Sequence, residues 1–398
     1  MKLIIKISNI ICIIISIIFL LYVFYRSEFY YHGTLRGYYF RYYFILSLSI
    51  IFFILIYFIN DQIKNYIFIS IGSIIFSLYL FEFYILFSNG INLFTDHNKF
   101  VYKSARTFLK DRNIYLLNNT PNKNYLSTRE NGYFAHWFSD RYGFNNPDEE
   151  WDKQDIDIVL VGDSFTQGEG VNRPYDIASQ LRNSKQTVLS LGLSGHGPLK
   201  NYAMLKEYLK SNHKKIFYLH YEGNDLTNLN NELNDPHLVK YLNNDFKYNL
   251  STNNFYLRTP SLFEGFIKIF YTRRLMEKYY FILFVEKHDK KKNKLIKISD
   301  FEKILKLCKE IVITNNSQFY FVYLPSKSRY VNIYSNKNFE DHFDQVKKII
   351  EDLNIPFIDV QEIFNENKNI NSLFAKYGGH YSIEGYKEVA KVIKQFVP

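Results

Sequence analysis

Cysteine is scarce in this sequence: only Cys12 and Cys308 occur among 398 residues. Cys12 lies in an apolar stretch and Cys308 in a predicted helix, so we expect no structural disulfide. Two cysteines do not identify the redox compartment. The ten histidines also lack a metal-ligand pattern such as H-E-x-x-H, and the sequence predicts neither a metal site nor a cofactor.

Nucleic-acid-binding modules are missing as well, although the formal net charge is +10. The lysines are scattered among Asn, Ile and Tyr, which indicates a compositional bias of the whole sequence. The one dense cluster, Lys287 to Lys294, is short and typical of a solvated loop. We therefore predict no nucleic-acid partner.

Apolar residues, in contrast, make up 47% of the chain, and much of the excess lies in the first ninety residues. Three stretches there, Ile4–Tyr25, Tyr43–Ile59 and Ile67–Phe87, each approach the ~20 residues that span a bilayer. No small-residue cleavage site follows the first stretch, so it is not typical of a signal peptide. We predict a transmembrane segment of three helices over residues 1–90.

Residues 91–150 form a polar connecting region with little periodicity, and strands alternate with helices from there onward. This alternation predicts an α/β domain over residues 151–398, with a parallel sheet covered by helices on both faces. A long, aromatic-rich insertion at about residues 228–298 breaks the pattern, and we interpret it as a lid or substrate wall. The predicted strands are Ile156–Val161, Thr187–Leu191, Lys215–Tyr221, Gln318–Leu324 and Ile355–Val360, and the predicted helices are Pro174–Asn183, Pro198–Asn212, Asp300–Thr314, Phe339–Leu353 and one that opens near Ser382.

The stretch DIDIVLVGDSFTQGEG is the most informative part of this domain. Its apolar run predicts a strand buried on both faces, and Gly162 permits a tight exit from it. Ser164 is therefore expected at the carboxyl edge of the sheet, where open α/β folds bind ligands. One alternative is that Asp163 or Ser164 only caps a helix. A phosphate loop is excluded because Glu169 stands where that loop needs a lysine.

Three further blocks follow later strands in the chain. SLGLSGHGPLKNY contains Gly195, whose backbone N–H can approach a ligand closely. YEGNDL contains Asn224, which can present an amide donor, and YGGHYSIEGY contains His380 just before the last helix. Each block alone is more typical of a structural role: a tight turn, a helix cap, or a structural histidine.

Taken in order, the four blocks resemble those of the SGNH/GDSL hydrolase family, which is named for the serine, glycine, asparagine and histidine of such blocks. The resemblance covers roughly residues 140 to 398. The stretches SDRYGFNNP and YEGNDL are similar to a bacterial branch of the family that carries amino-terminal membrane helices. The resemblance implies a flavodoxin-like three-layer fold with a parallel sheet, preceded here by the three predicted helices.

The resemblance also implies a role for each matching residue. Ser164 would be the nucleophile, and His380 would be the base that activates its hydroxyl. The Ser164 and Gly195 backbone N–H groups, with the Asn224 amide, would form an oxyanion hole for the charge that develops on a carbonyl oxygen.

Two positions depart from the family pattern. The last block usually reads Asp-x-x-His, but Tyr377 stands three residues before His380. Either His380 works in a dyad, or another acid such as Asp359 orients it. Ser190 stands where the second block often has asparagine, which is a milder change.

The resemblance implies a serine esterase or O-acyltransferase that acts on acyl esters, and the expected substrates are O-acetyl esters of a cell-surface polysaccharide or glycan. The expected partners are the membrane, an acylated carbohydrate and a membrane acyltransferase. The alternative, which Tyr377 favours, is a catalytically silent membrane-anchored scaffold or binding subunit of a polysaccharide assembly complex.

Two lines of reasoning disagree on the side of the membrane. The positive-inside rule favours a cytoplasmic domain, because Arg26, Arg36 and Arg41 lie between the first two apolar stretches. The family resemblance and the short, lysine-bearing amino terminus favour an extracytoplasmic domain, and we adopt this placement as the prediction.

Overall fold

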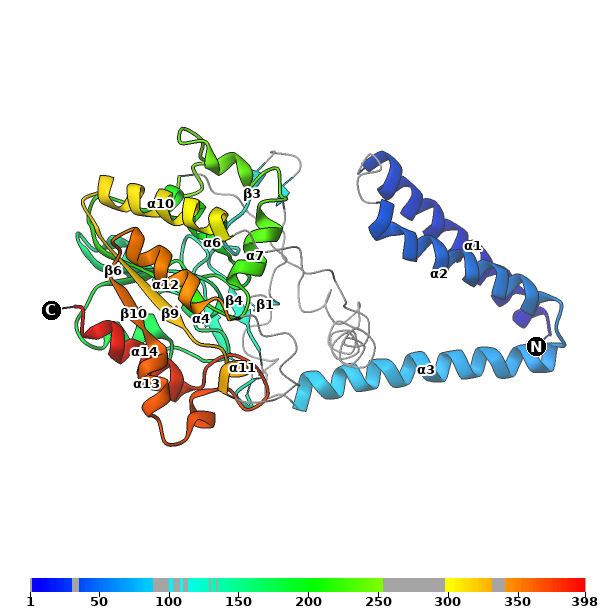
Figure 1. Ribbon diagram of the computed structural model, residues 1–398. Coiled ribbons are helices and arrows are strands. Elements are labelled where there is room, and N and C mark those ends of the chain that lie inside the picture. Colours follow the sequence, from blue (N-terminus) through cyan, green and yellow to red (C-terminus); the bar gives the residue numbers. More distant parts are fainter. Residues whose placement is uncertain are drawn as a thin grey trace. The chain divides into compact units, whose positions relative to one another are not determined.

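A computed structural model of the chain divides into two compact units, Met1–Ile85 and Leu86–Pro398, drawn in Figure 1. We describe each unit by itself. The structure describes residues 2–30, 36–88, 100–102, 108–109, 114–128, 130–133, 135–252, 298–330 and 341–397.

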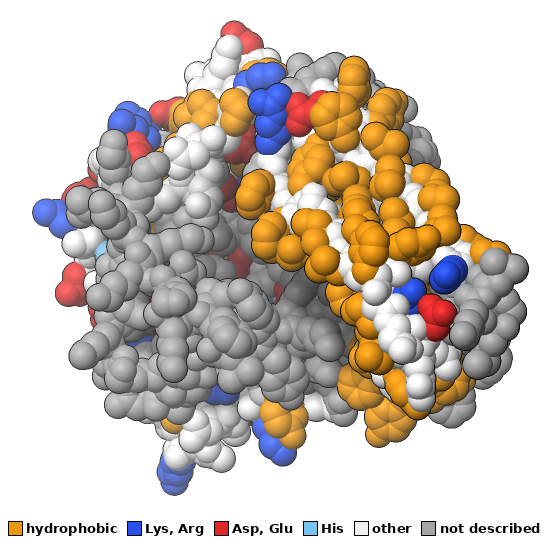
Figure 2. Space-filling view, turned by 90° about the vertical axis from the view of Figure 1, so that its right-hand side faces the viewer, with side chains coloured by type: hydrophobic (Ala, Val, Ile, Leu, Met, Phe, Trp, Pro, Cys, Tyr) orange, Lys and Arg blue, Asp and Glu red, His pale blue; other side chains and the backbone are white. Residues whose placement is uncertain are grey.

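The amino-terminal unit consists of helices. They are α1 (Lys2–Phe24), which continues as a π-helical turn (Tyr25–Tyr30), α2 (Arg36–Tyr57) and α3 (Asp61–Ser88). The hydroxyls of Ser16 and Ser49 are 3.1 Å apart and join α1 to α2. Exposed apolar side chains cover much of the outer surface of the helices, as the orange atoms in Figure 2 show.

Two of these helices, not three, are long and apolar enough to cross a membrane: Lys6–Phe29 and Asp61–Tyr84. The prediction of three spans was wrong for the second stretch. It does form a helix, but its apolar part, Tyr42–Tyr57, is shorter. The reason is that α2 begins with the polar sequence RGYYFR, and Arg36 there binds Glu28 through a 2.6 Å ion pair.

The second unit contains a five-stranded parallel sheet, as the sequence predicted. Its order β10-β9-β8-β6-β7 is the flavodoxin-like arrangement, in which the first strand lies between the second and third. The topological switch point, where ligands bind in such sheets, therefore lies at β6. The strands are β6 (Ile156–Val161), β7 (Val188–Ser190), β8 (His213–Tyr221), β9 (Gln318–Leu324) and β10 (Phe357–Asp359).

Helices cover both faces of the sheet and give three layers (Figure 1). Side chains of β6 alternate between two cores: Val159 and Val161 belong to one, Ile158 and Leu160 to the other. The first core is closed by α6 (Pro198–Tyr208), α10 (Ile298–Thr314) and α12 (Phe343–Asp352), and the second by α5 (Ile177–Arg182), α13 (Val360–Glu366) and α14 (Ile383–Lys394).

The predicted insertion at 228–298 is described only at its two ends. Helix α7 (Asp225–Glu232) and a 3-10 turn (Val239–Leu242) lead into a segment whose Tyr241 and Leu250 side chains are buried in the first core. These residues serve as core rather than as a lid. The rest of the predicted lid, 253–297, lies outside the described residues.

The segment predicted as a connecting region contributes to the fold. It contains a small sheet of order β1-β4-β5 and a two-stranded pair β2-β3. Leu116, Leu117 and Phe144 are fully or almost fully buried in the first core. The elements are β1 (Phe100–Tyr102), β2 (Phe108–Leu109), β3 (Ile114–Tyr115), β4 (Asn124–Leu126), β5 (His136–Phe138) and a 3-10 helix (Asp148–Asp152).

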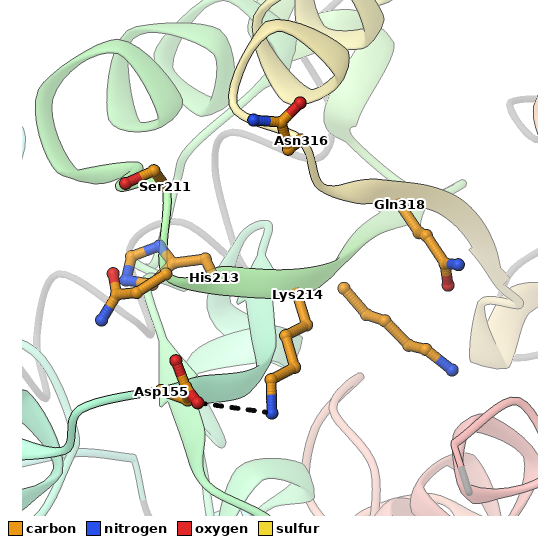
Figure 3. Close-up of a pocket in the computed structure, with 8 residues that line it drawn as sticks. Asp155, Ser211, His213, Lys214, Asn316 and Gln318 are labelled. Atoms are coloured by element: carbon orange, nitrogen blue, oxygen red, sulfur yellow. Dashed lines mark ion pairs between the residues drawn. The ribbon is translucent and has the colours of Figure 1, made fainter.

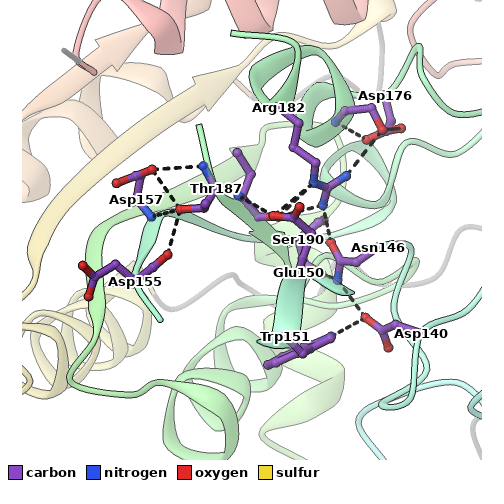
Figure 4. Close-up of polar contacts among 12 residues, drawn as sticks. Asp140, Asn146, Glu150, Trp151, Asp155, Asp157, Asp176, Arg182, Thr187 and Ser190 are labelled. Atoms are coloured by element: carbon purple, nitrogen blue, oxygen red, sulfur yellow. Dashed lines mark hydrogen bonds and ion pairs between the residues drawn. The ribbon is translucent and has the colours of Figure 1, made fainter. Parts of the chain in front are cut away.

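The SDRYGFNNP stretch closes the outer edge of the large sheet (Figure 4). The side-chain amide of Asn146 accepts from Ser190 N (2.8 Å) and donates to Ser190 O (3.0 Å), as a neighbouring strand would. It also accepts from Arg182 (2.6 Å) and donates to Asp140 (2.9 Å). The unpaired groups of an edge strand are thereby satisfied within the chain. Ser190 itself donates its hydroxyl to Thr166 O.

Candidate active site

The turn after β6 places Ser164 at the first position of the short helix α4 (Ser164–Gln167). Asp163 caps this helix, accepting from Phe165 N at 2.9 Å, so the capping alternative holds for Asp163. A Cβ on Gly162 would lie 2.7 Å from Leu219 O, which explains the glycine. The hydroxyl of Ser164 lies 3.4 Å from Oδ2 of Asp163, a long contact, and the residue is only 5% exposed.

The hydroxyl of Ser164 lies 2.9 Å from Nε2 of His380. The other ring nitrogen, Nδ1, lies 2.9 and 3.0 Å from the two carboxylate oxygens of Glu130. An ionised carboxylate only accepts hydrogen bonds, so the network assigns the ring proton to Nδ1 and leaves Nε2 to accept from the serine. The three side chains therefore form a continuous Ser–His–carboxylate relay.

The surroundings shift the pKa of His380 upward. Burial lowers it, but the hydrogen bond and charge of Glu130, together with the charges of Glu169 and Asp163, raise it by more. The ring also lies against Phe165, with centroids 4.8 Å apart, which limits its rotation. A histidine held in this way is a strong base that keeps one orientation.

Several contacts hold the Glu130 loop against the histidine loop. Tyr377 N donates to Glu130 O at 2.9 Å, and His380 N donates to the Glu130 carboxylate at 3.0 Å. Asn131 donates to Gly170 O, in the segment after the serine. A Cβ on Gly378 would lie 1.9 Å from the Glu130 carboxyl carbon, so the carboxylate occupies space that only a glycine leaves open.

The structure places Asp359 elsewhere, so our suggestion of it as the orienting acid is corrected. Asp359 caps α13 and accepts from Gln361 N at 2.9 Å. It ends β10, three strand positions and therefore about 14 Å from β6. Sequence reasoning missed Glu130 because it lies 250 residues from His380 in a segment without periodicity.

Gly195 and Asn224 follow the two strands that flank β6, so both lie at the same sheet edge as Ser164. Gly195 has a φ of +73°, which favours glycine. Asn224 stands at the N-cap of α7 but makes no capping hydrogen bond there. Its Oδ1 is buried and accepts no hydrogen bond from the described part of the chain.

Acidic groups are buried beneath the serine. Burial, with the charge of Asp225 nearby, raises the pKa of Asp163 to about 8. Asp225 is not simply a helix cap: its Oδ2 accepts from Tyr221 N at 3.0 Å and lies 3.3 Å from Nδ1 of His220. Asp163 and Asp225 thus bind the backbone at the carboxyl ends of β6 and β8, respectively.

A pocket of about 480 Å³ lies at the other edge of the sheet (Figure 3). Asp155, His213 and Gln318, at or next to the amino ends of β6, β8 and β9, help to line it. It is therefore separate from Ser164. Among the described residues, no group of three or more His, Cys, Asp or Glu side chains is arranged to hold a metal ion.

Comparisons with known proteins find similarity only at the level of structure. No protein-family model matches the sequence. No curated relative was found. The chain is similar to a protein described as lipolytic and of the G-D-S-L family from Desulfitobacterium hafniense, with 15% identity, 61% of this chain and 100% of that chain covered, and a TM-score of 0.37.

Two further solved structures belong to acetyl xylan esterases. AlAXEase is 14% identical, with 61% of this chain and 100% of that chain covered and a TM-score of 0.37. Axe2 from Geobacillus stearothermophilus is 13% identical, with 60% and 93% covered and a TM-score of 0.32. Each of these three alignments covers about 60% of this chain.

Proposed function

We propose that this chain is an SGNH/GDSL-type serine esterase or O-acyltransferase. Ser164 is the nucleophile, His380 the general base and Glu130 the acid that orients the imidazole. The observation that carries the proposal is the unbroken relay from the Ser164 hydroxyl through His380 to the Glu130 carboxylate. A serine is activated when a base lies within hydrogen-bond reach of its hydroxyl and a third group orients that base.

Each group has a defined task in this mechanism. Ser164 attacks the acyl carbon while His380 Nε2 takes the hydroxyl proton, and Glu130 stabilises the imidazolium that forms. The backbone N–H groups of Ser164 and Gly195, with the Asn224 amide, receive the negative charge on the acyl oxygen. His380 then returns the proton to the leaving alcohol. Water or a sugar hydroxyl resolves the acyl-enzyme, which gives hydrolysis or transfer.

The substrate we propose is an O-acetyl ester of a cell-surface polysaccharide or glycan. The support is the resemblance of the four sequence blocks to a membrane-anchored bacterial branch, together with two helices long and apolar enough to span a bilayer. Two spans from a cytoplasmic amino terminus would return the chain to the cytoplasm. The extracytoplasmic placement of the domain that carries Ser164 therefore rests on the family resemblance alone, and on that basis we propose that the domain works beside a membrane acyltransferase. A reporter that works only in the cytoplasm can be fused to the carboxyl terminus to test this placement. Activity of that fused reporter would contradict it.

The alternative of a silent scaffold subunit loses its main support. It was favoured by Tyr377 at the position where the family has aspartate. Glu130 now supplies a carboxylate to His380 Nδ1. Tyr377 contributes its backbone N–H to the Glu130 loop, while its side chain is 59% exposed.

Labelling of the full chain in detergent by a fluorophosphonate serine probe tests the proposed function. We expect labelling of the wild type, none of Ser164→Ala and a sharp reduction in His380→Ala. Ser179→Ala is the matched control, because Ser179 is also a buried serine but is hydrogen-bonded to Asp176 on α5. A folded wild type that remains unlabelled would favour the scaffold alternative.

A further inference from the structure

We propose that Glu232 and Asn228 are positioning residues that hold the Gly195 loop in register with Asn224, so that one helix, α7, fixes two of the three donors of the oxyanion hole. The inference rests on the proposed function and extends it to residues outside the four sequence blocks.

The carboxylate of Glu232 binds the loop that follows β7. It accepts from Gly197 N at 2.7 Å, Leu199 N at 3.0 Å and Lys200 N at 3.3 Å. These N–H groups lie at the amino-terminal end of α6, which would otherwise leave them unsatisfied and which attracts negative charge. Glu232 is only 2% exposed, so few water molecules could replace it.

Side chains of Lys200 and Asn228 also bind the loop at Gly195 and His196. The ammonium group of Lys200 lies 3.5 Å from Glu232 and donates to Gly195 O at 3.1 Å. Asn228 donates to His196 O, the next carbonyl along the loop, at 3.4 Å. The backbone from 195 to 197 is therefore bound by side chains of α6 and α7 at successive residues.

The loop lies directly against α7. A Cβ on Gly197 would be 2.7 Å from Asn228 Cβ and 2.9 Å from a Glu232 oxygen, so this contact requires glycine. Asn224, Asn228 and Glu232 are spaced four residues apart, which places them on one face of the helix. The residue that presents the amide donor thus shares a helical face with the two residues that hold the loop.

The contacts of α7 with the Gly195 loop fix the positions of two donors that come from separate loops. Gly195 follows β7 and Asn224 follows β8, so the two donors lie on opposite sides of β6 and belong to separate loops. An oxyanion hole requires its donors at fixed positions around one oxygen. A single helix that carries Asn224 and binds the other loop fixes their separation.

A double-mutant cycle on the rate of fluorophosphonate labelling tests the inference, because that reaction also places negative charge in the oxyanion hole. We expect Asn224→Ala to lower the rate by about 10²-fold. Glu232→Gln should lower it by about tenfold in the wild type, but by less than about twofold in Asn224→Ala, because residues that act as a unit are not additive.

Glu207→Gln is the matched control. Glu207 is a buried glutamate of α6 that also accepts from two backbone N–H groups, those of Tyr248 and Leu250, but in a segment away from the sheet edge. We expect its thermal destabilisation to resemble that of Glu232→Gln, with less than a twofold change in labelling. If Glu232→Gln lowered the labelling rate by the same factor in the wild type and in Asn224→Ala, the inference would be overturned. A wild type without Ser164-dependent labelling would overturn the proposed function itself, and the positioning role with it.

Discussion

The Glu130 carboxylate lies 2.9 Å from Nδ1 of His380, although 250 residues separate them in the chain. In the proposed mechanism this contact replaces the one that Asp-x-x-His would provide, in which the carboxylate stands three residues before the histidine. Here the carboxylate comes from the segment between β4 and β5, outside the large sheet.

Glu130→Gln should alter the pH profile of labelling. The base must be neutral to take a proton, so the wild-type rate falls as pH drops through the His380 pKa, which lies above its usual value of 6.5. The amide removes the hydrogen bond and charge that raise this pKa, while burial continues to lower it. We expect the acid limb to move to lower pH and the plateau rate to fall by about 10²–10⁴. An unchanged acid limb would show that Glu130 does not act through His380.

Gly378→Ala should displace the Glu130 carboxylate, because a Cβ there would lie 1.9 Å from the carboxyl carbon. We expect a loss of labelling close to that of Glu130→Ala and little further loss when the two changes are combined. Gly379→Ala is the neighbouring control, since a Cβ at 379 meets no atom within 4 Å. Equal effects at 378 and 379 would point to the flexibility of the loop instead.

Asp359→Asn should leave labelling unchanged, because asparagine is also a good N-cap and Asp359 caps α13. Asp359→Ala should lower the free energy of unfolding by about 0.5–2 kcal/mol through loss of the cap, again without a specific effect on the labelling rate. A change in the pH profile of either variant would restore Asp359 as the orienting acid.

Asn146→Ala should destabilise the second unit by about 2–3 kcal/mol, because Ser190, Arg182 and Asp140 all lose a buried partner. Trp151, which donates to Asp140 at 2.7 Å, provides a fluorescence signal for denaturant unfolding. Exposed Asp155→Asn should change the free energy of unfolding by less than about 0.5 kcal/mol. Similar denaturant midpoints of unfolding for Asn146→Ala and Asp155→Asn would contradict the role of Asn146 at the sheet edge.

The large sheet could be predicted from sequence because its signals are local. The apolar run Ile156–Val161 and the strand Gln318–Leu324 have the predicted bounds, since continuous β-branched and aromatic runs are typical of buried parallel strands. The bounds of β10 shifted because Asp359 begins a helix that removes Val360 from the predicted strand.

The parts that the sequence could not predict depend on contacts between distant segments. The second apolar stretch forms a helix, but its apolar part, Tyr42–Tyr57, is shorter than the ~20 residues that a span needs. Glu130 was missed because nothing in its neighbouring sequence, RENG at 129–132, distinguishes it from other acidic residues. Gly378, far from Glu130 in the sequence, has no side chain and so leaves the space that the carboxylate occupies.

The position of Glu130 places part of the proposed relay outside the large sheet, in the segment that precedes it. A protein shortened to begin at Asp155 would retain all five strands of the large sheet, with Ser164 and His380 at its edge. It would lack the carboxylate, the Asn131 amide that binds the serine loop, and the buried Leu116, Leu117 and Phe144. Transplanting the chemistry of this chain therefore requires the segment that precedes the sheet, because the sheet alone carries an incomplete relay.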